Sequence, residues 1–362
     1  IMKERIAIIE GTRTPFCKSD SILKEWSAAD LGAFSVKDLL SITDFPAEEI
    51  DEVIAGNVAQ PAESMNIARI IALKAGLPQK IPAFTVQRNC ASGMEAITSA
   101  ASKIIAGEGN VYLSCSTESM SHMPFYFPHE AAIFLKSLAK CRNWWQKLSV
   151  LRHFKLSYLK PVYGLQLGLT DPICGLIMGK TAEILAKEFL ISREEQDLFA
   201  LQSHKKANRA REEKRFAEEI SPVPINNYQD FQFDDNGIRP ELSIGQLQKL
   251  RPIFNRYTGS VTSGNSCQIT DGACSMLLMR ESESIRRGYK PLGYIRSFAY
   301  SGLCGTKMGL GPVYATAKLL QNSQWQLSDF DLIEINEAFS SQVLSCLKAF
   351  SSKSFCEKEL NL

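Results

Sequence analysis

The chain has 362 residues, of which 45% are hydrophobic and 22% are charged, a balance typical of a globular enzyme built of two or three modules. Its net charge of +2 argues neither for nor against nucleic acid, and we expect no nucleic-acid partner. The sequence shows neither a secretory signal pattern nor an apolar run of membrane-spanning length. Ten cysteines without a disulfide-like framework suit a reducing cytosol, so we expect a cytoplasmic protein.

The first third of the chain alternates between the periodicities of strands and helices. Strands are expected at residues 5–9 and 51–55, and a buried strand at 110–115. A helix is expected to begin at the Ser27 capping box and to run to Leu40. Another helix is expected at 66–75, ended by a glycine and a proline. This alternation predicts a layered α/β domain with helices packed on a sheet.

Cys90 lies where an apolar run, residues 83–86, changes into a helix-like run, residues 91–106. The unpaired N–H groups at the start of a helix favour negative charge and can lower the pKa of a thiol. Ser92 and Gly93 keep the neighbourhood small, so that a substrate carbonyl can approach. We interpret Cys90 as an acyl-accepting nucleophile. The alternative is that Cys90, like most cysteines of soluble proteins, is a small buried hydrophobic residue.

The remaining candidate ligands form no recognisable motif. The ten cysteines contain no Cys-x-x-Cys pair, and the four histidines do not lie at the spacing of zinc ligands. The glycine-rich stretches lack both the dinucleotide-binding and the Walker spacing. We therefore expect no metal and no nucleotide cofactor.

A second α/β unit repeats the first at a constant offset, in which Asp51 corresponds to Asp331 and Val53 to Ile333. The second copy is expected to contain a strand at 292–300, a helix from Pro312, a strand at 331–335 and a helix at 338–350. At the same offset, the counterpart of Cys90 in the second unit would fall beyond Leu362. The repeat therefore predicts that the second unit is incomplete, with too few strands to cover its apolar faces.

Five short motifs follow one another along the chain on the expected elements. They are residues 89–93 (Asn-Cys-Ala-Ser-Gly), 259–265 (Gly-Ser-Val-Thr-Ser-Gly-Asn), 270–273 (Thr-Asp-Gly-Ala), 308–312 (Met-Gly-Leu-Gly-Pro) and 336–339 (Asn-Glu-Ala-Phe). With these motifs the chain resembles the thiolases, specifically the degradative 3-ketoacyl-CoA thiolases. The resemblance implies a duplicated, layered α/β fold with an inserted loop domain. It divides the chain into an N-terminal half (1–120 and 246–285), a loop domain (121–245) and a partial C-terminal half (286–362).

The resemblance also implies roles for individual residues. Cys90 corresponds to the nucleophile that carries the acyl group, Asn336 to the residue that holds an oxyanion-hole water, and Glu337 to a support of that loop. The acyl and CoA channel is implied to involve Leu169, Met178, Phe254, Ser263, Met308, Ala338 and Phe339. Ile177 replaces a histidine of many short-chain biosynthetic members, which favours longer-chain, degradative substrates. CoA enters as a substrate, and no cofactor is implied.

Two motifs of the family, Gly-His-Pro and Cys-x-Gly, do not occur in these 362 residues. The expected activity is thiolysis of 3-ketoacyl-CoA in fatty-acid β-oxidation, by acyl transfer through Cys90. Two alternatives remain open: a Claisen-condensing ketoacyl synthase, and an inactive remnant that binds CoA, lipid or a partner. On the residues alone, 259–265 could be an ordinary turn and Asn336-Glu337 a helix N-cap pair.

Residues 134–161 carry seven lysines and arginines and no acid, interleaved with residues such as Trp144 and Trp145. This composition is typical of an interfacial helix, and the alternative is a packed helix with a solvated basic face. The resemblance implies a longer insert used against a membrane or a partner subunit. The expected partners are therefore acyl-CoA and CoA, a second copy of the chain or a hydratase/dehydrogenase subunit, and a peripheral membrane contact through 134–161.

Overall fold

The computed structural model describes residues 4–362 and divides them into two compact units. The larger unit comprises the chain up to His122 together with Gly179–Leu362, and the smaller unit is Met123–Met178. Each unit has its own strands and helices, and the two are described separately below.

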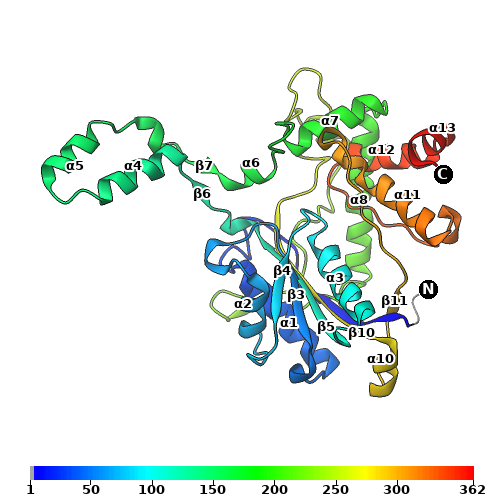
Figure 1. The fold of residues 1–362 in the computed structure, drawn as a ribbon. Coiled ribbons are helices and arrows are strands. Elements are labelled where there is room, and N and C mark those ends of the chain that lie inside the picture. The colour runs from blue at the N-terminus through cyan, green and yellow to red at the C-terminus, as the bar shows by residue number, and fades with distance from the viewer. Residues whose placement is uncertain (1–3) are drawn as a thin grey trace. The chain divides into compact units, whose positions relative to one another are not determined.

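A 7-stranded mixed sheet forms the centre of the larger unit, in the order β11-β1-β10-β5-β3-β4, with β2 paired to β10 (Figure 1). β3 runs parallel to β4 and β5, and the other pairs are antiparallel. The strands are β1 (Ile6–Arg13), β2 (Cys17–Lys18), β3 (Glu52–Gly56), β4 (Ala83–Val86), β5 (Val111–Ser119), β10 (Thr270–Arg280) and β11 (Gly293–Ile295). The expected strands at 5–9, 51–55 and 110–115 are thus confirmed.

Helices cover both faces of this sheet. α1 (Ala28–Thr43) begins at the expected capping box, in which the Ser27 side chain and Asp30 satisfy each other's backbone N–H groups, and α2 (Ile67–Lys74) packs beside it. α3 (Ser92–Ala106) lies on the opposite face. The layered α/β fold predicted from the alternating periodicities is confirmed.

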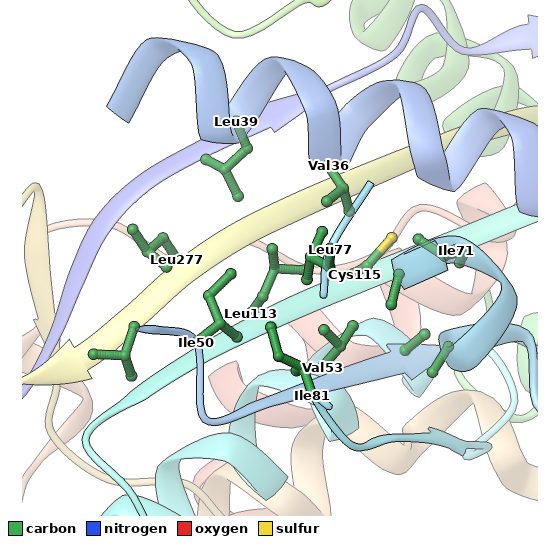
Figure 2. Close-up of a cluster of buried hydrophobic side chains, with 14 of the residues drawn as sticks. Val36, Leu39, Ile50, Val53, Ile71, Leu77, Ile81, Leu113, Cys115 and Leu277 are labelled. Carbon is green, nitrogen blue, oxygen red and sulfur yellow. The ribbon is translucent and has the colours of Figure 1, made fainter. Parts of the chain in front are cut away.

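Neighbouring residues of each strand serve opposite cores, because successive side chains of a strand point to opposite faces. Val53 and Leu277 pack with α1 and α2, as Figure 2 shows, whereas Ile54 and Leu278 pack under α3. Each large apolar side chain buried in this way contributes about 1.5–3 kcal/mol. A register slip of one residue would exchange the two cores, so the sheet has one stable register.

The rest of the larger unit is mainly helical. Its helices are α7 (Met178–Glu188), α8 (Arg193–Glu212), α9 (Ile244–Gln248), α10 (Glu281–Arg287), α11 (Gly311–Ser323), α12 (Ser340–Ser351) and α13 (Lys353–Phe355), with a 3-10 segment η5 (Gly305–Leu310) and a short hairpin β8 (Val223–Ile225)–β9 (Asp230–Gln232). A separate core joins α7, η5, α11 and α12 around Leu185, Leu310, Val313 and Cys346.

The second α/β unit departs from the repeat. Its helices α11 and α12 form as expected, but the predicted strand at 292–300 shrinks to β11, and the predicted strand at 331–335 is wrong. Leu332 is 91% exposed and Ile333 57% exposed, whereas Val343 on α12 is buried. Within residues 4–362 no strand lies alongside 331–335, and without a neighbour its backbone groups cannot form the ladder that defines a strand.

The smaller unit holds a two-stranded ladder, β6 (Phe125–Tyr126) with β7 (Val162–Tyr163), and the helices α4 (His129–Ala139), α5 (Trp144–Leu151) and α6 (Gly164–Gly168). The rings of Phe134, Phe154 and Tyr158 form its small aromatic cluster. Trp144 and Trp145 remain 60% and 65% exposed. Across residues 4–362, no helix has the length and apolar character needed to cross a bilayer.

Candidate active site

Cys90 lies in a tight turn between the end of β4 and the start of α3, as the sequence predicted. The turn uses a left-handed backbone at Asn89 (φ 47°) and hydrogen bonds from Ala91 N to Arg88 O and from Ser92 N to Asn89 O, both 3.0 Å. Ser92 Oγ accepts a hydrogen bond from Arg88 N (2.8 Å) and donates one to Asn89 O (2.7 Å). The turn leaves Cys90 exposed to solvent, directly before Ala91, the N-cap of α3. The alternative that Cys90 is a small buried residue is wrong.

Arg88 anchors this turn to the neighbouring structure. Its guanidinium forms an ion pair with Glu95 on α3 and lies over the Tyr300 ring, 3.9 Å from the ring centroid. The hydrogen bond from Arg88 lowers the pKa of Glu95. Through these two contacts Arg88 ties the Cys90 turn to α3 and to the segment that carries Tyr300.

Cys267 lies within electrostatic reach of Cys90. Desolvation raises the pKa of the Cys267 thiol, and the Coulomb interaction with Cys90 raises it further. The backbone N–H of Cys267 donates to Ala338 O at 2.9 Å. This bond joins Cys267 to the segment that contains Asn336 and Glu337.

The 336–339 segment runs antiparallel to the end of the 259–265 motif. Besides the Cys267–Ala338 bond, Ser266 bridges Phe339, and Ser340 N donates to Asn265 O at 3.0 Å. Because α12 begins only at Ser340 with Phe339 as its N-cap, the alternative that Asn336-Glu337 caps a helix is wrong. The structure thus brings together two motifs that are far apart in the sequence.

Asn265 fixes the other side of this ladder from a buried position. Its Nδ2 donates to Asp197 Oδ1 on α8 (2.9 Å) and to Ser260 O (3.1 Å), while its Oδ1 accepts from Thr262 N (2.8 Å). Glu183 on α7 accepts from the N–H groups of Ser260 (2.9 Å) and Val261 (3.0 Å). The 259–265 motif is therefore a turn, as the alternative expected, but one whose shape two helices fix.

Two contacts near this segment involve residues that sequence analysis did not assign. Ser203 on α8 donates a hydrogen bond to Glu337 Oε2 at 2.6 Å. The adjacent His204 is partly buried. Burial lowers the pKa of His204, Arg239 and Lys18 lower it further, and Glu337 raises it. The sequence carries no signal for these contacts, because a serine and a histidine in a charged helix look like surface residues.

Phe254, Phe339 and Met308 lie in separate segments of the larger unit, Met308 within η5 and Phe339 at the N-cap of α12. The Phe254 ring covers Gly179 so closely that a Cβ there would come 2.1 Å from the ring, and it meets the Phe339 ring edge to face with centroids 6.2 Å apart. Met308, 39% exposed, precedes Gly309, whose carbonyl accepts from Cys346 Sγ at 3.2 Å. Ser263 is exposed within the 259–265 turn.

Leu169 and Met178 come together at one end of the smaller unit. Leu169 follows α6 and is 37% exposed, and Met178 N donates to Leu169 O at 2.9 Å. Within residues 4–362, no group of three or more His, Cys, Asp or Glu side chains could hold a metal ion.

Comparison with known proteins identifies the family. Residues 6–282 match the thiolase N-terminal domain and residues 289–362 the thiolase C-terminal domain. The chain is 38% identical over 358 residues to 3-ketoacyl-CoA thiolase of Pseudoalteromonas translucida, covering 99% of this chain and 81% of the relative. It is equally similar to 3-ketoacyl-CoA thiolase of Colwellia psychrerythraea, with 82% of that relative covered.

Solved structures give the same result. The human mitochondrial 3-ketoacyl-CoA thiolase superimposes with a TM-score of 0.86 at 32% identity, covering 98% of this chain and 85% of the other. An acetyl-CoA acetyltransferase of Bacillus anthracis gives a TM-score of 0.85 at 32% identity, with 99% and 84% covered. The expectation of an incomplete C-terminal half is not supported by the family comparison, because the C-terminal domain is matched. The chain belongs to the thiolase family.

Proposed function

We propose that this protein catalyses thiolysis of 3-ketoacyl-CoA by CoA, giving acyl-CoA and acetyl-CoA. The observation that carries the proposal is the exposed Cys90 thiol in a rigid turn at the start of α3. The Cys90 thiolate attacks the 3-keto carbon, the bond between the 2- and 3-carbons breaks, and the 2-carbon takes up a proton as acetyl-CoA leaves. The thiol of a second CoA then attacks the acyl-Cys90 thioester, loses its proton, and releases Cys90.

Other residues of the proposed site bind and orient the substrate. Asn336 holds a water that stabilises the oxyanion, and Glu337 supports its loop. The acyl and CoA channel involves Phe254, Ser263, Met308, Ala338 and Phe339. In this proposal residues 1–120 and 246–285 form one thiolase half, 286–362 belong to the other, and 121–245 are the loop domain.

The test is to incubate the protein with a 3-ketoacyl-CoA, with and without CoA, and to measure acetyl-CoA release and acylation by peptide mass spectrometry. We expect the acyl group on Cys90 and turnover when CoA is added. Cys90→Ser should abolish both, whereas Cys141→Ser, a cysteine at the end of α4, should leave both unchanged. An acyl group on another residue would contradict the mechanism. CoA binding without acylation would favour the alternative of an inactive remnant. Acyl transfer from an acyl-carrier protein would favour the alternative of a ketoacyl synthase.

We further propose that the protein self-associates along β4. This strand lies at the edge of the sheet and pairs only with β3 among the described strands. The backbone groups of an exposed edge are a template for another strand. Sedimentation velocity should give a species of twice the chain mass. Ala83→Pro should shift it to the monomer, because Ala83 points its backbone groups away from β3 and the substitution removes an N–H from the free edge of β4. Association with a hydratase/dehydrogenase subunit in place of self-association would contradict this part.

The third part of the proposal assigns the smaller unit to an anionic membrane surface. Trp144, Trp145, Leu156 and Leu159 are at least 60% exposed, and the seven cations of 134–161 have no acid among them. Apolar anchors insert at the headgroup level while cations attract anionic lipid, each by about 1 kcal/mol near the surface. Because the ten cysteines are all free, we place the protein in the reducing cytoplasm, on the inner leaflet.

Vesicle binding tests this assignment. The protein should bind vesicles of phosphatidylcholine with phosphatidylserine more strongly than pure phosphatidylcholine, and the binding should weaken as salt rises. Replacing Trp144 and Trp145 by Ser should reduce binding, whereas Leu190→Ser, which changes an 83% exposed residue outside the segment, should not. Equal binding to neutral vesicles, or none to either, would favour a solvated basic face.

A further inference from the structure

The segment that carries Asn336 and Glu337 has little regular structure of its own. Residues 331–335 have no helix or strand, and Asp331–Glu334 are exposed. The backbone contacts described above begin only at Ala338. A surface carboxylate such as that of Glu337 usually samples several rotamers, because water solvates each of them equally well.

Ser203 limits this freedom from outside the segment. Its hydroxyl, half-way along α8, donates to Glu337 Oε2 at 2.6 Å, which is the length of a strong charge-assisted O–H···O⁻ bond. The two residues are separated by 134 positions in the sequence, so the bond joins independent parts of the larger unit. It holds the segment one residue before the first backbone contact and directly after Asn336.

α8 is a rigid support for this hydroxyl. Its first turn is closed by a capping box between Ser192 and Glu195. The Asp197 carboxylate, fully buried, accepts from Arg193 Nε at 2.8 Å and from Asn265 Nδ2 at 2.9 Å. Arg193 also donates to Leu247 O at 2.6 Å. The helix α8 therefore holds both sides of the ladder between 265–267 and 338–340. Asp197 binds Asn265 on one side, and Ser203 binds Glu337, directly before the ladder, on the other.

We propose that Ser203 is a positioning residue for the thiolase site: its hydroxyl fixes the Glu337 carboxylate and thereby orients Asn336. The effect on rate rests on the proposed function. The positional effect does not, because it concerns only the described contacts. A loop held to within half an ångström matters for catalysis, since a displacement of 1 Å costs about a hundredfold in rate.

His204 supplies a reporter that does not depend on activity. Arg239 N donates to His204 Nδ1 at 3.3 Å, and the charges facing the ring are those of Arg239, Lys18 and Glu337. Burial, Arg239 and Lys18 lower the pKa of His204, and Glu337 raises it. If Ser203 stops holding Glu337 in place, the pKa of His204 should fall further below its usual value. A purely structural role of Ser203 would not shift this titration.

The experiment compares Ser203→Ala with Ser203→Thr, which keeps the hydroxyl, and with Asn208→Ala. Asn208 is a matched control on α8, because its side-chain hydrogen bonds stay within that helix. Three quantities are measured: amide hydrogen exchange of Cys267 and Ser340, whose N–H groups donate across the ladder, the His204 titration by NMR (assigned with His204→Gln), and kcat and KM for thiolysis. In Ser203→Ala we expect exchange about tenfold faster at these two amides, a lower His204 pKa, and kcat about tenfold lower with KM for CoA little changed. Ser203→Thr should restore all three.

The outcomes separate this inference from the proposed function. Unchanged exchange and an unchanged His204 titration in Ser203→Ala would overturn the positioning role, whatever the activity. Altered exchange and titration without thiolysis in the unsubstituted protein would confirm the contact and contradict the proposed function. An equal response of Asn208→Ala would show that α8 as a whole was perturbed and would also overturn the inference.

Discussion

The backbones of Gly56 and Ser92 lie in direct contact: a Cβ placed on Gly56 would lie only 2.4 Å from the carbonyl oxygen of Ser92. Gly56 is the last residue of β3, and Ser92 is the first residue of α3. The absence of a side chain at Gly56 lets the start of α3 rest directly on the sheet. This contact fixes the height of the Cys90 turn above the strand ends.

Gly56→Ala should therefore destabilise the protein, by about 1–3 kcal/mol, because backbone atoms cannot move aside as a flexible side chain can. Urea unfolding followed by circular dichroism measures the change. Gly293→Ala in β11 is the matched control, since a Cβ at Gly293 would meet nothing within 4 Å. Equal stability of the two variants would show that α3 can lift from the sheet without cost.

Cys90 should react with iodoacetamide near neutral pH faster than the other nine cysteines. It is exposed at the start of a helix, whereas burial raises the pKa of Cys115 to about 12 and that of Cys346 to about 11. The pKa of Cys267 is raised as well, so Cys267 should follow Cys90 more slowly despite its exposure. Peptide mapping after limited alkylation gives the order, and labelling spread evenly over the ten thiols would contradict it.

Gly179→Ala should displace the Phe254 ring, because the added Cβ would come 2.1 Å from ring atoms. Phe254 contacts Phe339, so the displacement should reach the proposed acyl and CoA channel. We expect KM for CoA to rise by about three- to tenfold, the loss of roughly 1 kcal/mol of binding. Steady-state kinetics measure it, with Gly245→Ala as control, where a Cβ would meet nothing within 4 Å. An unchanged KM for CoA would show that Phe254 does not shape the proposed channel.

Stability should depend on acid pH through Glu283. Hydrogen bonds from Arg286 and Arg287 lower the pKa of Glu283 from 4.5 to about 2. Because the folded pKa is depressed, the stabilisation is complete above pH 4.5 and decreases as pH falls toward 2. Glu283→Gln should be less stable at pH 7 by less than about 1 kcal/mol, since Arg286 is largely exposed.

The difference between Glu283→Gln and the unsubstituted protein should shrink as the pH is lowered from 5 toward 3, and should also shrink in concentrated salt, which screens surface charges. Urea midpoints at each pH provide the measurement. A difference that stays constant with pH would assign the effect of Glu283 to packing.

Local patterns predicted the first α/β unit well, because its signals are short-range. The Ser27 capping box, the strand at 51–55 and the strand-to-helix change at Cys90 all appear in the structure where the sequence placed them. The strand at 331–335 failed because a strand exists only with a neighbour, and the repeat carries no information about its neighbours. The Ser203–Glu337 contact could not be predicted from the sequence for a related reason: it joins residues that share no local pattern.

The position of β10 in the sheet has a consequence for biosynthesis. β10 pairs with both β1 and β5, and it supplies Leu277 and Met279 to the core under α1. At roughly 5–20 residues per second, the roughly 150 residues between β5 and β10 take the ribosome about 8–30 s to add. Throughout that interval the nascent chain exposes an unpaired β1 and an open edge on β5. This interval, set by the topology of the sheet, is when the emerging polypeptide depends most on chaperones to escape aggregation.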